Sequence, residues 1–153
     1  MTNFLLKITI AVLIIASPLI KVTAQDGFKT AGTIGKSYNE INNAFGNYYC
    51  KETNASKWFC FYGEDNSYDC ISTLINFTFS NNRVKSFIYM WEHSSYSLAM
   101  QDVNYETTRL AKIYGRPEYK SGSSYFLINN CTIISTYTFQ NGKHYSTLSF
   151  IGK

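Results

Sequence analysis

The segments Asn76-Phe77-Thr78-Phe79-Ser80-Asn81-Asn82-Arg83 and Thr136-Tyr137-Thr138-Phe139-Gln140-Asn141-Gly142-Lys143 align without a gap. In both, a strand-like run meets a two-residue turn, and Asn and Gly favour such turns because they tolerate positive φ. A helix-like segment that ends in an aromatic residue followed by glycine precedes each of them, at Phe45-Gly46 and Tyr114-Gly115. The sequence therefore predicts a structural unit that occurs twice.

Each predicted unit contains one helix followed by three strands. Ser37 and Glu40 have the spacing of a capping box at the start of the first helix, and apolar residues recur at helical spacing in the second. We expect an α+β fold class, in which tandem α-β-β-β repeats (about 33–91 and about 98–153) form one antiparallel sheet with both helices packed on one face. The expected helices cover 37–45 and 103–114, and the expected strands cover 57–62, 69–80, 83–91, 124–128, 131–140 and 143–151.

The two turns predict which side chains share a face of the sheet, because successive residues of a strand point to opposite sides. The Asn141-Gly142 turn pairs Phe139 with His144, Tyr137 with Ser146 and Ile133 with Phe150, and leaves a more solvated face of mostly Thr and Ser. The Asn81-Asn82 turn pairs Phe79 with Val84, Phe77 with Ser86 and Ile75 with Ile88. The expected core face of the first unit then contains Phe59, Phe61, Ile71, Ile75, Phe77, Phe79, Val84, Ile88 and Met90.

The first 24 residues have the features of a secretory signal peptide. Lys7 precedes an apolar run over 8–15, and Val22-Thr23-Ala24 offers small residues for cleavage before Gln25. The apolar run is too short for a membrane span and is followed by Pro18. We expect residues 25–153 to form a single domain without a membrane span, exported to the periplasm or outside the cell.

The charge of the chain argues against nucleic-acid binding. The formal net charge is +4, and it becomes +2 when Lys7 and Lys21 are removed with the signal peptide. The basic residues are scattered along the chain, whereas nucleic acids require a concentrated basic surface. Aromatic residues make up 17% of the sequence, which is enough for a core and for a contact face as well.

Four cysteines, Cys50, Cys60, Cys70 and Cys131, follow the signal peptide. An even number in an oxidising compartment predicts two disulfides, for which three connectivities are possible. A hairpin with its loop near Asp65 would place Cys60 opposite Cys70 at a distance that a disulfide can span. Cys50 would then pair with Cys131 and join the two units.

No motif indicates a catalytic site, a metal site or a cofactor. No serine lies in a Gly-x-Ser-x-Gly context. His93 falls in a polar link and His144 follows a turn, so we expect both at the surface and not as paired metal ligands. The enzymatic alternatives are a Cys131–His144 pair and a carboxylate cluster for glycoside hydrolysis at Glu64, Asp65 and Asp69.

The second face of the first unit is unusually aromatic. It contains Trp58, Tyr62, Phe87, Tyr89 and Trp91, together with Cys60, Cys70 and Leu74. Trp and Tyr dominate protein interfaces because they combine a large rigid area with a polar tip. We therefore predict an exported, non-catalytic binding protein that engages a protein partner through this aromatic sheet face. The alternative function is a glycan or small-molecule binding module, since aromatic rings also stack on sugars.

The double α-β-β-β pattern resembles the β-lactamase-inhibitor-like fold and the SmpA–OmlA family of small outer-membrane assembly lipoproteins. The first is a tandem repeat whose open sheet face grips a protein partner through aromatic residues, and the second is a single shorter unit. The resemblance covers nearly all of residues 25–153 as architecture and includes no diagnostic motif. The cysteine pattern and the missing lipobox depart from the second family. The resemblance implies the topology and protein binding, and it assigns no functional residue.

Overall fold

The structure is a computed structural model that describes residues 27–46, 49–53, 56–62 and 70–153. The contacts within the chain divide it into two units, residues 1–30 and 31–153, and the fold reported below is that of the second unit. The expected signal peptide and the carboxylates of Glu64, Asp65 and Asp69 lie outside the described residues. Among the helices of the described ranges, none combines the length and the hydropathy that a membrane crossing requires.

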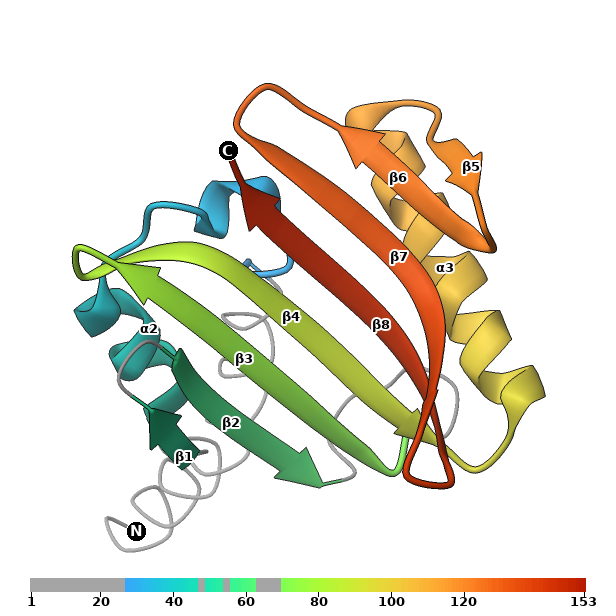
Figure 1. Cartoon of the computed structure of the whole chain (residues 1–153), viewed down its shortest axis with the longest axis horizontal. Coiled ribbons are helices and arrows are strands. Elements are labelled where there is room, and N and C mark those ends of the chain that lie inside the picture. Colours follow the sequence, from blue (N-terminus) through green and yellow to red (C-terminus); the bar gives the residue numbers. More distant parts are fainter. Residues whose placement is uncertain (1–26, 47–48, 54–55, 63–69) are drawn as a thin grey trace, which may run out of the picture. The chain divides into compact units, whose positions relative to one another are not determined.

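The second unit is built on one antiparallel sheet of eight strands (Figure 1). The strand order is β1-β2-β3-β4-β8-β7-β6-β5, and the fold class is α+β as predicted. The elements along the chain are the 3-10 helix η1 (Ala31–Thr33), α2 (Tyr38–Phe45), β1 (Tyr49–Thr53), β2 (Ser56–Tyr62), β3 (Ser72–Ser80), β4 (Arg83–His93), α3 (Tyr96–Tyr114), β5 (Glu118–Lys120), β6 (Ser123–Leu127), β7 (Cys131–Gln140) and β8 (Lys143–Gly152).

Each repeat contains one helix and four strands, so the predicted count of three strands is wrong. The additional strands, β1 and β5, are short and lie at the two edges of the sheet. The last strands of the two repeats, β4 and β8, pair with each other in the centre. Equivalent strands therefore take equivalent places on either side of this central pair, as two copies of one unit would.

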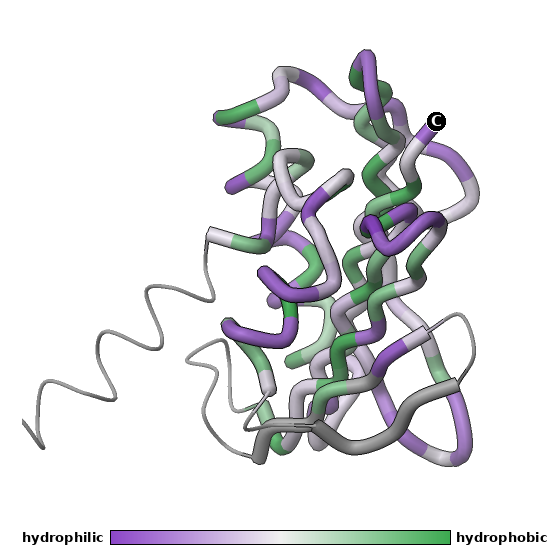
Figure 2. Tube along the Cα trace, turned by 90° about the vertical axis from the view of Figure 1, so that its left-hand side faces the viewer, coloured by the Kyte–Doolittle hydropathy of each residue, from purple (hydrophilic) through white to green (hydrophobic). Residues whose placement is uncertain are grey.

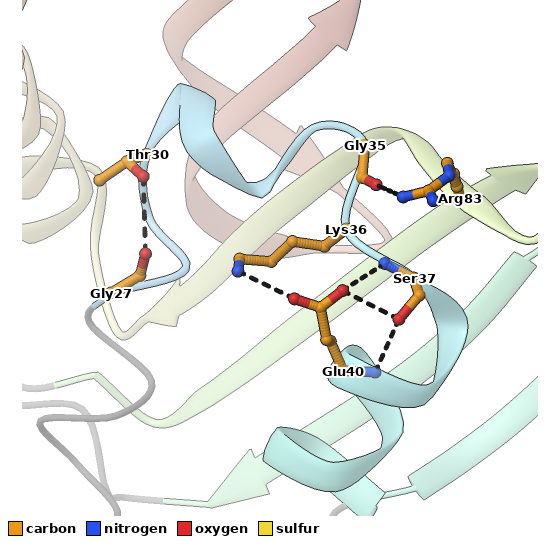
Figure 3. Close-up of polar contacts among 7 residues, drawn as sticks. All are labelled: Gly27, Thr30, Gly35, Lys36, Ser37, Glu40 and Arg83. Atoms are coloured by element: carbon orange, nitrogen blue, oxygen red, sulfur yellow. Dashed lines mark hydrogen bonds and ion pairs between the residues drawn. The ribbon is translucent and has the colours of Figure 1, made fainter.

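The predicted capping box is present at the start of α2 (Figure 3). The Ser37 hydroxyl accepts from the Glu40 backbone N–H at 3.3 Å, and the Ser37 backbone N–H donates to Glu40 Oε2 at 2.8 Å. Lys36 Nζ donates to the other carboxylate oxygen of Glu40 at 3.3 Å. The hydrogen bonds from the Ser37 backbone, the Ser37 hydroxyl and Lys36 lower the pKa of Glu40 to about 2. At its other end, α2 stops at Gly46 in a right-handed conformation with φ −54°, and not in the predicted left-handed one.

Helix α3 begins at Tyr96, well before the predicted start at Val103. Ser95 caps it, because the Ser95 hydroxyl accepts from the Leu98 backbone N–H at 3.3 Å. Apolar residues occur in the first turn, but the buried inner face of α3 then includes the polar residues Asp102, Glu106 and Thr107. A search for apolar residues at helical spacing therefore detects only the second half of this helix.

The register of the second hairpin is the predicted one. Phe139 pairs with His144, and the ladder continues with Tyr137–Ser146 and Ile133–Phe150. Asn141 and Gly142 adopt φ of 53° and 76°, which a tight hairpin turn requires. The predicted alternation of this half of the sheet is therefore confirmed.

The first hairpin departs from the predicted register at a β-bulge. Phe79 pairs with Val84 as predicted, but Thr78 pairs with Ser86, so Lys85 is an extra residue on β4. One inserted residue moves every following side chain of a strand to the opposite face. Beyond the bulge, Phe77 pairs with Phe87 and Ile75 with Tyr89, in place of the predicted partners Ser86 and Ile88.

Phe87, Tyr89 and Trp91 are consequently core residues, and the prediction that they form an exposed partner-binding face is wrong. Their exposed fractions are 2%, 1% and 1%. The Phe87 ring stacks on Phe150 with centroids 4.3 Å apart, and Tyr89 stacks on Trp91. Ile88 and Met90, which were predicted to lie in the core, point to the other side of the sheet.

The helices pack on the same face as this aromatic core (Figure 2). Phe45 of α2 contacts Phe59 and Phe77, with ring centroids 5.4 Å apart in both pairs. Helix α3 contacts the sheet through Thr107, whose hydroxyl donates to Ser135 Oγ at 3.1 Å and to Ser124 Oγ at 3.4 Å. Small hydroxyl side chains let α3 approach β6 and β7 closely.

The two predicted disulfide pairings stay predictions, because each involves a cysteine whose side chain is not described. Cys60 pairs with Leu74 in the β2–β3 ladder and does not lie opposite Cys70. The Cys70 thiol donates to the Ser72 carbonyl at 3.1 Å. Cys131 is buried, and its thiol is free in the structure. The side chains of Cys50 and Cys60 lie outside the described residues.

Candidate binding site

The five predicted partner-binding residues have different positions in the fold. Phe87, Tyr89 and Trp91 are buried beneath the helices, so they are not available to a partner. Trp58 and Tyr62 lie in β2, opposite Asn76 and Ser72 of β3. Their side chains fall outside the described residues, so the contact role of these two residues stays a prediction.

The sheet face away from the described helices is here called the open face. It is built from alternate residues of adjacent strands, and most of them are Thr, Ser or aliphatic. Its residues on β3, β4, β8, β7 and β6 are Ser72, Leu74, Asn76, Thr78, Ser86, Ile88, Met90, Glu92, Tyr145, Thr147, Ser149, Ile151, Thr132, Ile134, Thr136, Thr138, Tyr125 and Leu127.

Glu92 is the one charged residue in this set, and its charge is compensated. Lys143 Nζ donates to Glu92 at 2.9 Å, and the Ser72 hydroxyl donates to it at 2.9 Å. Burial alone would raise the pKa of Glu92, but these two hydrogen bonds and the charge of Lys143 together lower it. The open face is therefore close to neutral, and a depletion of charge is characteristic of the centres of protein interfaces.

One corner of the open face is aliphatic. Leu127 and Ile151 are exposed by 59% and 46%, and they flank Thr132 in a row across β6, β7 and β8. In the adjacent row Ile134 of β7 and Ile88 of β4 lie on either side of Ser149. We call Leu127, Ile134, Ile151 and Ile88 the aliphatic corner. Clustered exposed aliphatic side chains of this kind mark contact surfaces more often than single ones do.

A second exposed cluster is aromatic and lies on the helix side of the sheet, where β7 and β8 extend past the start of α3. Tyr96 meets Tyr137 edge to face with centroids 4.9 Å apart, and Phe139 lies 5.0 Å from the ring of His144. A hydrogen bond of 2.8 Å between Tyr137 Oη and His144 Nδ1 joins the two pairs. We call these four residues the hairpin cluster. Tyr96 and Phe139 are exposed by 55% and 59%.

The interior holds a polar cluster that the sequence did not indicate. The Ser146 hydroxyl of β8 donates to Asp102 Oδ2 of α3. His93 Nε2 of β4 lies 3.0 Å from Ser146 Oγ and 3.4 Å from Asp102 Oδ2. All three residues are buried, so the prediction of a surface position for His93 is wrong.

These residue types occur together in hydrolytic triads, but the geometry here is different. In a triad the imidazole stands between the hydroxyl and the carboxylate, using one ring nitrogen for each. Here the same nitrogen of His93 faces both groups, and the Ser146 hydroxyl donates directly to Asp102. Since Ser146 is also buried, the arrangement suits the attachment of α3 to the sheet and not attack on a substrate.

The structure also bears on the predicted Cys131–His144 alternative and on metal binding. Cys131 pairs with Gly152, at the opposite end of the β7–β8 ladder from His144, so these two residues do not form a catalytic pair. Burial raises the pKa of the Cys131 thiol, which makes it a poor nucleophile. Within the described ranges, no three His, Cys, Asp or Glu side chains are arranged to hold a metal ion.

The residues that sequence reasoning missed have identifiable signals. Tyr96 lies outside the predicted helix over 103–114, so the sequence did not bring it next to Tyr137, although the pairing of Phe139 with His144 was predicted. Comparison with known proteins finds no matching family model, no similar curated protein and no similar solved structure.

Proposed function

We propose that this chain is an exported, non-catalytic binding protein that engages a protein partner through the open face of its sheet. The observation that carries the proposal is the aliphatic corner on the face of β3, β4, β8, β7 and β6 that lies away from the described helices, where Glu92 is the one charged residue among those named above. Export is inferred from the signal-peptide features of residues 1–24.

The open face alone would be weak support, because antiparallel sheets commonly have one solvated face. Two features distinguish it from an ordinary solvated face. Glu92, the one carboxylate among the residues named above, is paired with Lys143, and Leu127 and Ile151 are exposed on either side of Thr132. A partner that covers the aliphatic corner would remove this apolar area from water at a gain of about 25 cal/mol per Å².

The surface is also rigid. Its residues belong to long strands of a sheet in which β4 and β8 pair over their length and are each paired on their other side as well. A preorganised surface loses little conformational entropy when it binds. This supports recognition by a fixed face, as opposed to recognition by loops that fold on binding.

The test is a comparison of two isoleucine substitutions. Ile151→Arg places a charge in the aliphatic corner, whereas Ile113→Arg places it on α3 at a residue of similar exposure, 53%. The tagged protein is incubated with the extracytoplasmic fraction of its own source, and bound proteins are identified by mass spectrometry. We expect a partner to be recovered with the wild type and with Ile113→Arg and to be lost with Ile151→Arg.

Equal recovery of the same partner with both variants would exclude the open face. Trp58→Ala then tests whether Trp58 of β2, one of the predicted partner-binding residues, contacts the partner. If that change reduces recovery while Ile151→Arg does not, the partner contacts the β2 side of the sheet and not the aliphatic corner.

A further inference from the structure

We propose that the hairpin cluster binds a sugar ring of a glycan, independently of the protein partner assigned to the open face. The cluster is a continuous series of four rings, Tyr96–Tyr137–His144–Phe139, each within 6.0 Å of the next by ring centroids. The two terminal rings, Tyr96 and Phe139, are more than half exposed. Exposed apolar side chains that lie together mark ligand-binding and contact sites, whereas scattered single ones do not.

The exposed rings offer the surface that a sugar ring requires. The faces of a pyranose carry C–H groups with a partial positive charge, and the face of an aromatic ring is partially negative. Phe139 and Tyr96 therefore provide stacking positions at the two ends of the cluster. The ring of Tyr137 packs edge to face against Tyr96 at 85° and thereby fixes the orientation of the Tyr96 ring.

The cluster also offers hydrogen-bonding groups for sugar hydroxyls. His144 uses Nδ1 for Tyr137 Oη, and within the described part of the chain its Nε2 and the hydroxyl of Tyr96 make no hydrogen bond. The amides of Gln140 and Asn141 are exposed at the adjacent turn. Each of these groups can donate to, or accept from, a hydroxyl.

Size and charge favour a glycan over the other occupants. A typical protein interface buries about 800 Å² on each side, whereas an aromatic side chain buries about 150–250 Å² even when it is fully covered. Two half-exposed rings therefore match one or two sugar units better than a protein surface. The neighbouring cation of Lys143 is bound to Glu92 on the open face, so an anionic ligand gains little here.

Isothermal titration calorimetry on the protein without its first 24 residues tests the proposal, with cellohexaose, chitohexaose, maltohexaose and a decaproline peptide as probes. We expect saturable binding of at least one oligosaccharide and none of decaproline. Phe139→Ala and Tyr96→Ala are each expected to weaken that binding about tenfold, the effect of losing one stacked ring with its contacts. Tyr137→Phe keeps the ring but releases His144, and it is expected to weaken binding about threefold, the effect of one lost orienting hydrogen bond.

The controls separate this site from the open face. Tyr119→Ala removes an exposed tyrosine on β5 outside the cluster, and it should bind the oligosaccharide as the wild type does, as should Ile151→Arg. Thermal unfolding of each variant checks that the fold is retained. The proposal is overturned if none of the three oligosaccharides gives saturable binding, if Phe139→Ala and Tyr96→Ala bind as the wild type, or if decaproline alone binds. None of these results bears on the protein partner of the open face.

Discussion

The hydroxyl group of Ser146 donates a hydrogen bond to Asp102 Oδ2 and thereby joins the central strand β8 to helix α3 in the protein interior. His93 of the neighbouring strand β4 lies within 3.4 Å of the same carboxylate oxygen. The other oxygen, Asp102 Oδ1, has no hydrogen-bond partner among the described residues. A buried carboxylate is costly unless it is paired, so the position of α3 depends on these contacts as well as on apolar area.

The first prediction is that Asp102 and Ser146 act as a unit. Asp102→Ala removes the buried carboxylate to which the Ser146 hydroxyl donates, and we expect a loss of about 3 kcal/mol in the free energy of unfolding. Ser146→Ala is expected to cost about 1–3 kcal/mol. In urea unfolding, the double variant should be more stable than the sum of the single changes predicts, by about 1 kcal/mol. The control combines Asp102→Ala with Thr108→Ala, at an exposed position of the same helix, and here the two stability losses should add. If the losses from Asp102→Ala and Ser146→Ala also add, Asp102 and Ser146 are not coupled.

The second prediction concerns the buried aromatic stack. Trp91→Ala removes a side chain that is 1% exposed and stacks on Tyr89, and we expect a loss of about 3–5 kcal/mol in the free energy of unfolding. An exposed tryptophan would cost about 0.5 kcal/mol or less. Urea denaturation followed by circular dichroism distinguishes a buried from an exposed Trp91. Tyr105→Ala, at an exposed site on α3, serves as the control with little effect.

The third prediction isolates the bulge in β4. Deletion of Lys85 removes the extra residue and leaves Val84 and Phe87 two positions apart on a regular strand, so Phe87, Tyr89 and Trp91 stay on the core face. We expect the deletion variant to unfold cooperatively and to lose no more than about 3 kcal/mol in the free energy of unfolding. Lys85→Ala keeps the residue count and loses only an exposed side chain, so its stability should stay within about 0.5 kcal/mol of the wild type. Loss of cooperative unfolding in the deletion variant would mean that the bulge itself, and not the alternation of core side chains, holds β4 in register.

The fourth prediction is that Gly152 cannot carry a side chain. A Cβ atom at this position would lie 2.6 Å from the carbonyl oxygen of Lys85 and 3.1 Å from Ile34 Cγ2. Gly152→Ala should therefore cost about 1–3 kcal/mol in the free energy of unfolding, because backbone has to move. Gly46→Ala has the opposite expectation: Gly46 is right-handed and has space around it, so stability should rise by about 0.5 kcal/mol. Thermal unfolding of the wild type and both variants shows whether each substitution lowers or raises the stability.

The fifth prediction concerns pH and the start of α2. The folded pKa of Glu40 is about 2, whereas the unfolded value is about 4.3. The charged capping contacts seen in Figure 3 therefore stabilise the protein above pH 4.3, and this contribution is lost as the pH falls towards 2. Glu40→Gln lacks the contribution, so the stability difference between wild type and variant should shrink over this range, and it should be smaller at high salt because the site is exposed. If urea unfolding gives the same stability difference between wild type and Glu40→Gln at every pH, the lowered pKa of Glu40 is refuted.

The β7–β8 hairpin of the second repeat could be predicted from the sequence, because Asn141-Gly142 defines the turn and the ladder continues without a bulge. The first repeat could not. Val84 lies on the core face, and Phe87, Tyr89 and Trp91 continue that face after Lys85, so the alternation changes phase within the strand. That change is visible only in retrospect, since Ile88 and Met90 make the other face of β4 equally apolar.

The prediction of the candidate surfaces depended on the same change of alternation in β4. The prediction of an aromatic binding face failed because one inserted residue exchanged its members with the core, whereas the Thr- and Ser-rich face of the second repeat was placed correctly. The hairpin cluster was missed because it requires the start of α3, and the polar inner face of that helix hides the apolar spacing. The buried Asp102, Ser146 and His93 come together only through the pairing of β4 with β8, which no local pattern encodes.

The central position of β8 determines when the protein can fold. Ribosomal synthesis makes residues 143–152 after every other strand, yet β8 forms the ladder that connects β4 with β7. Until those ten residues are available, β4 has an unpaired edge, and Phe87 lacks its stacking partner Phe150. The strands of the first repeat can pair with one another before β8 is made, but the sheet that joins the two repeats is complete only after it.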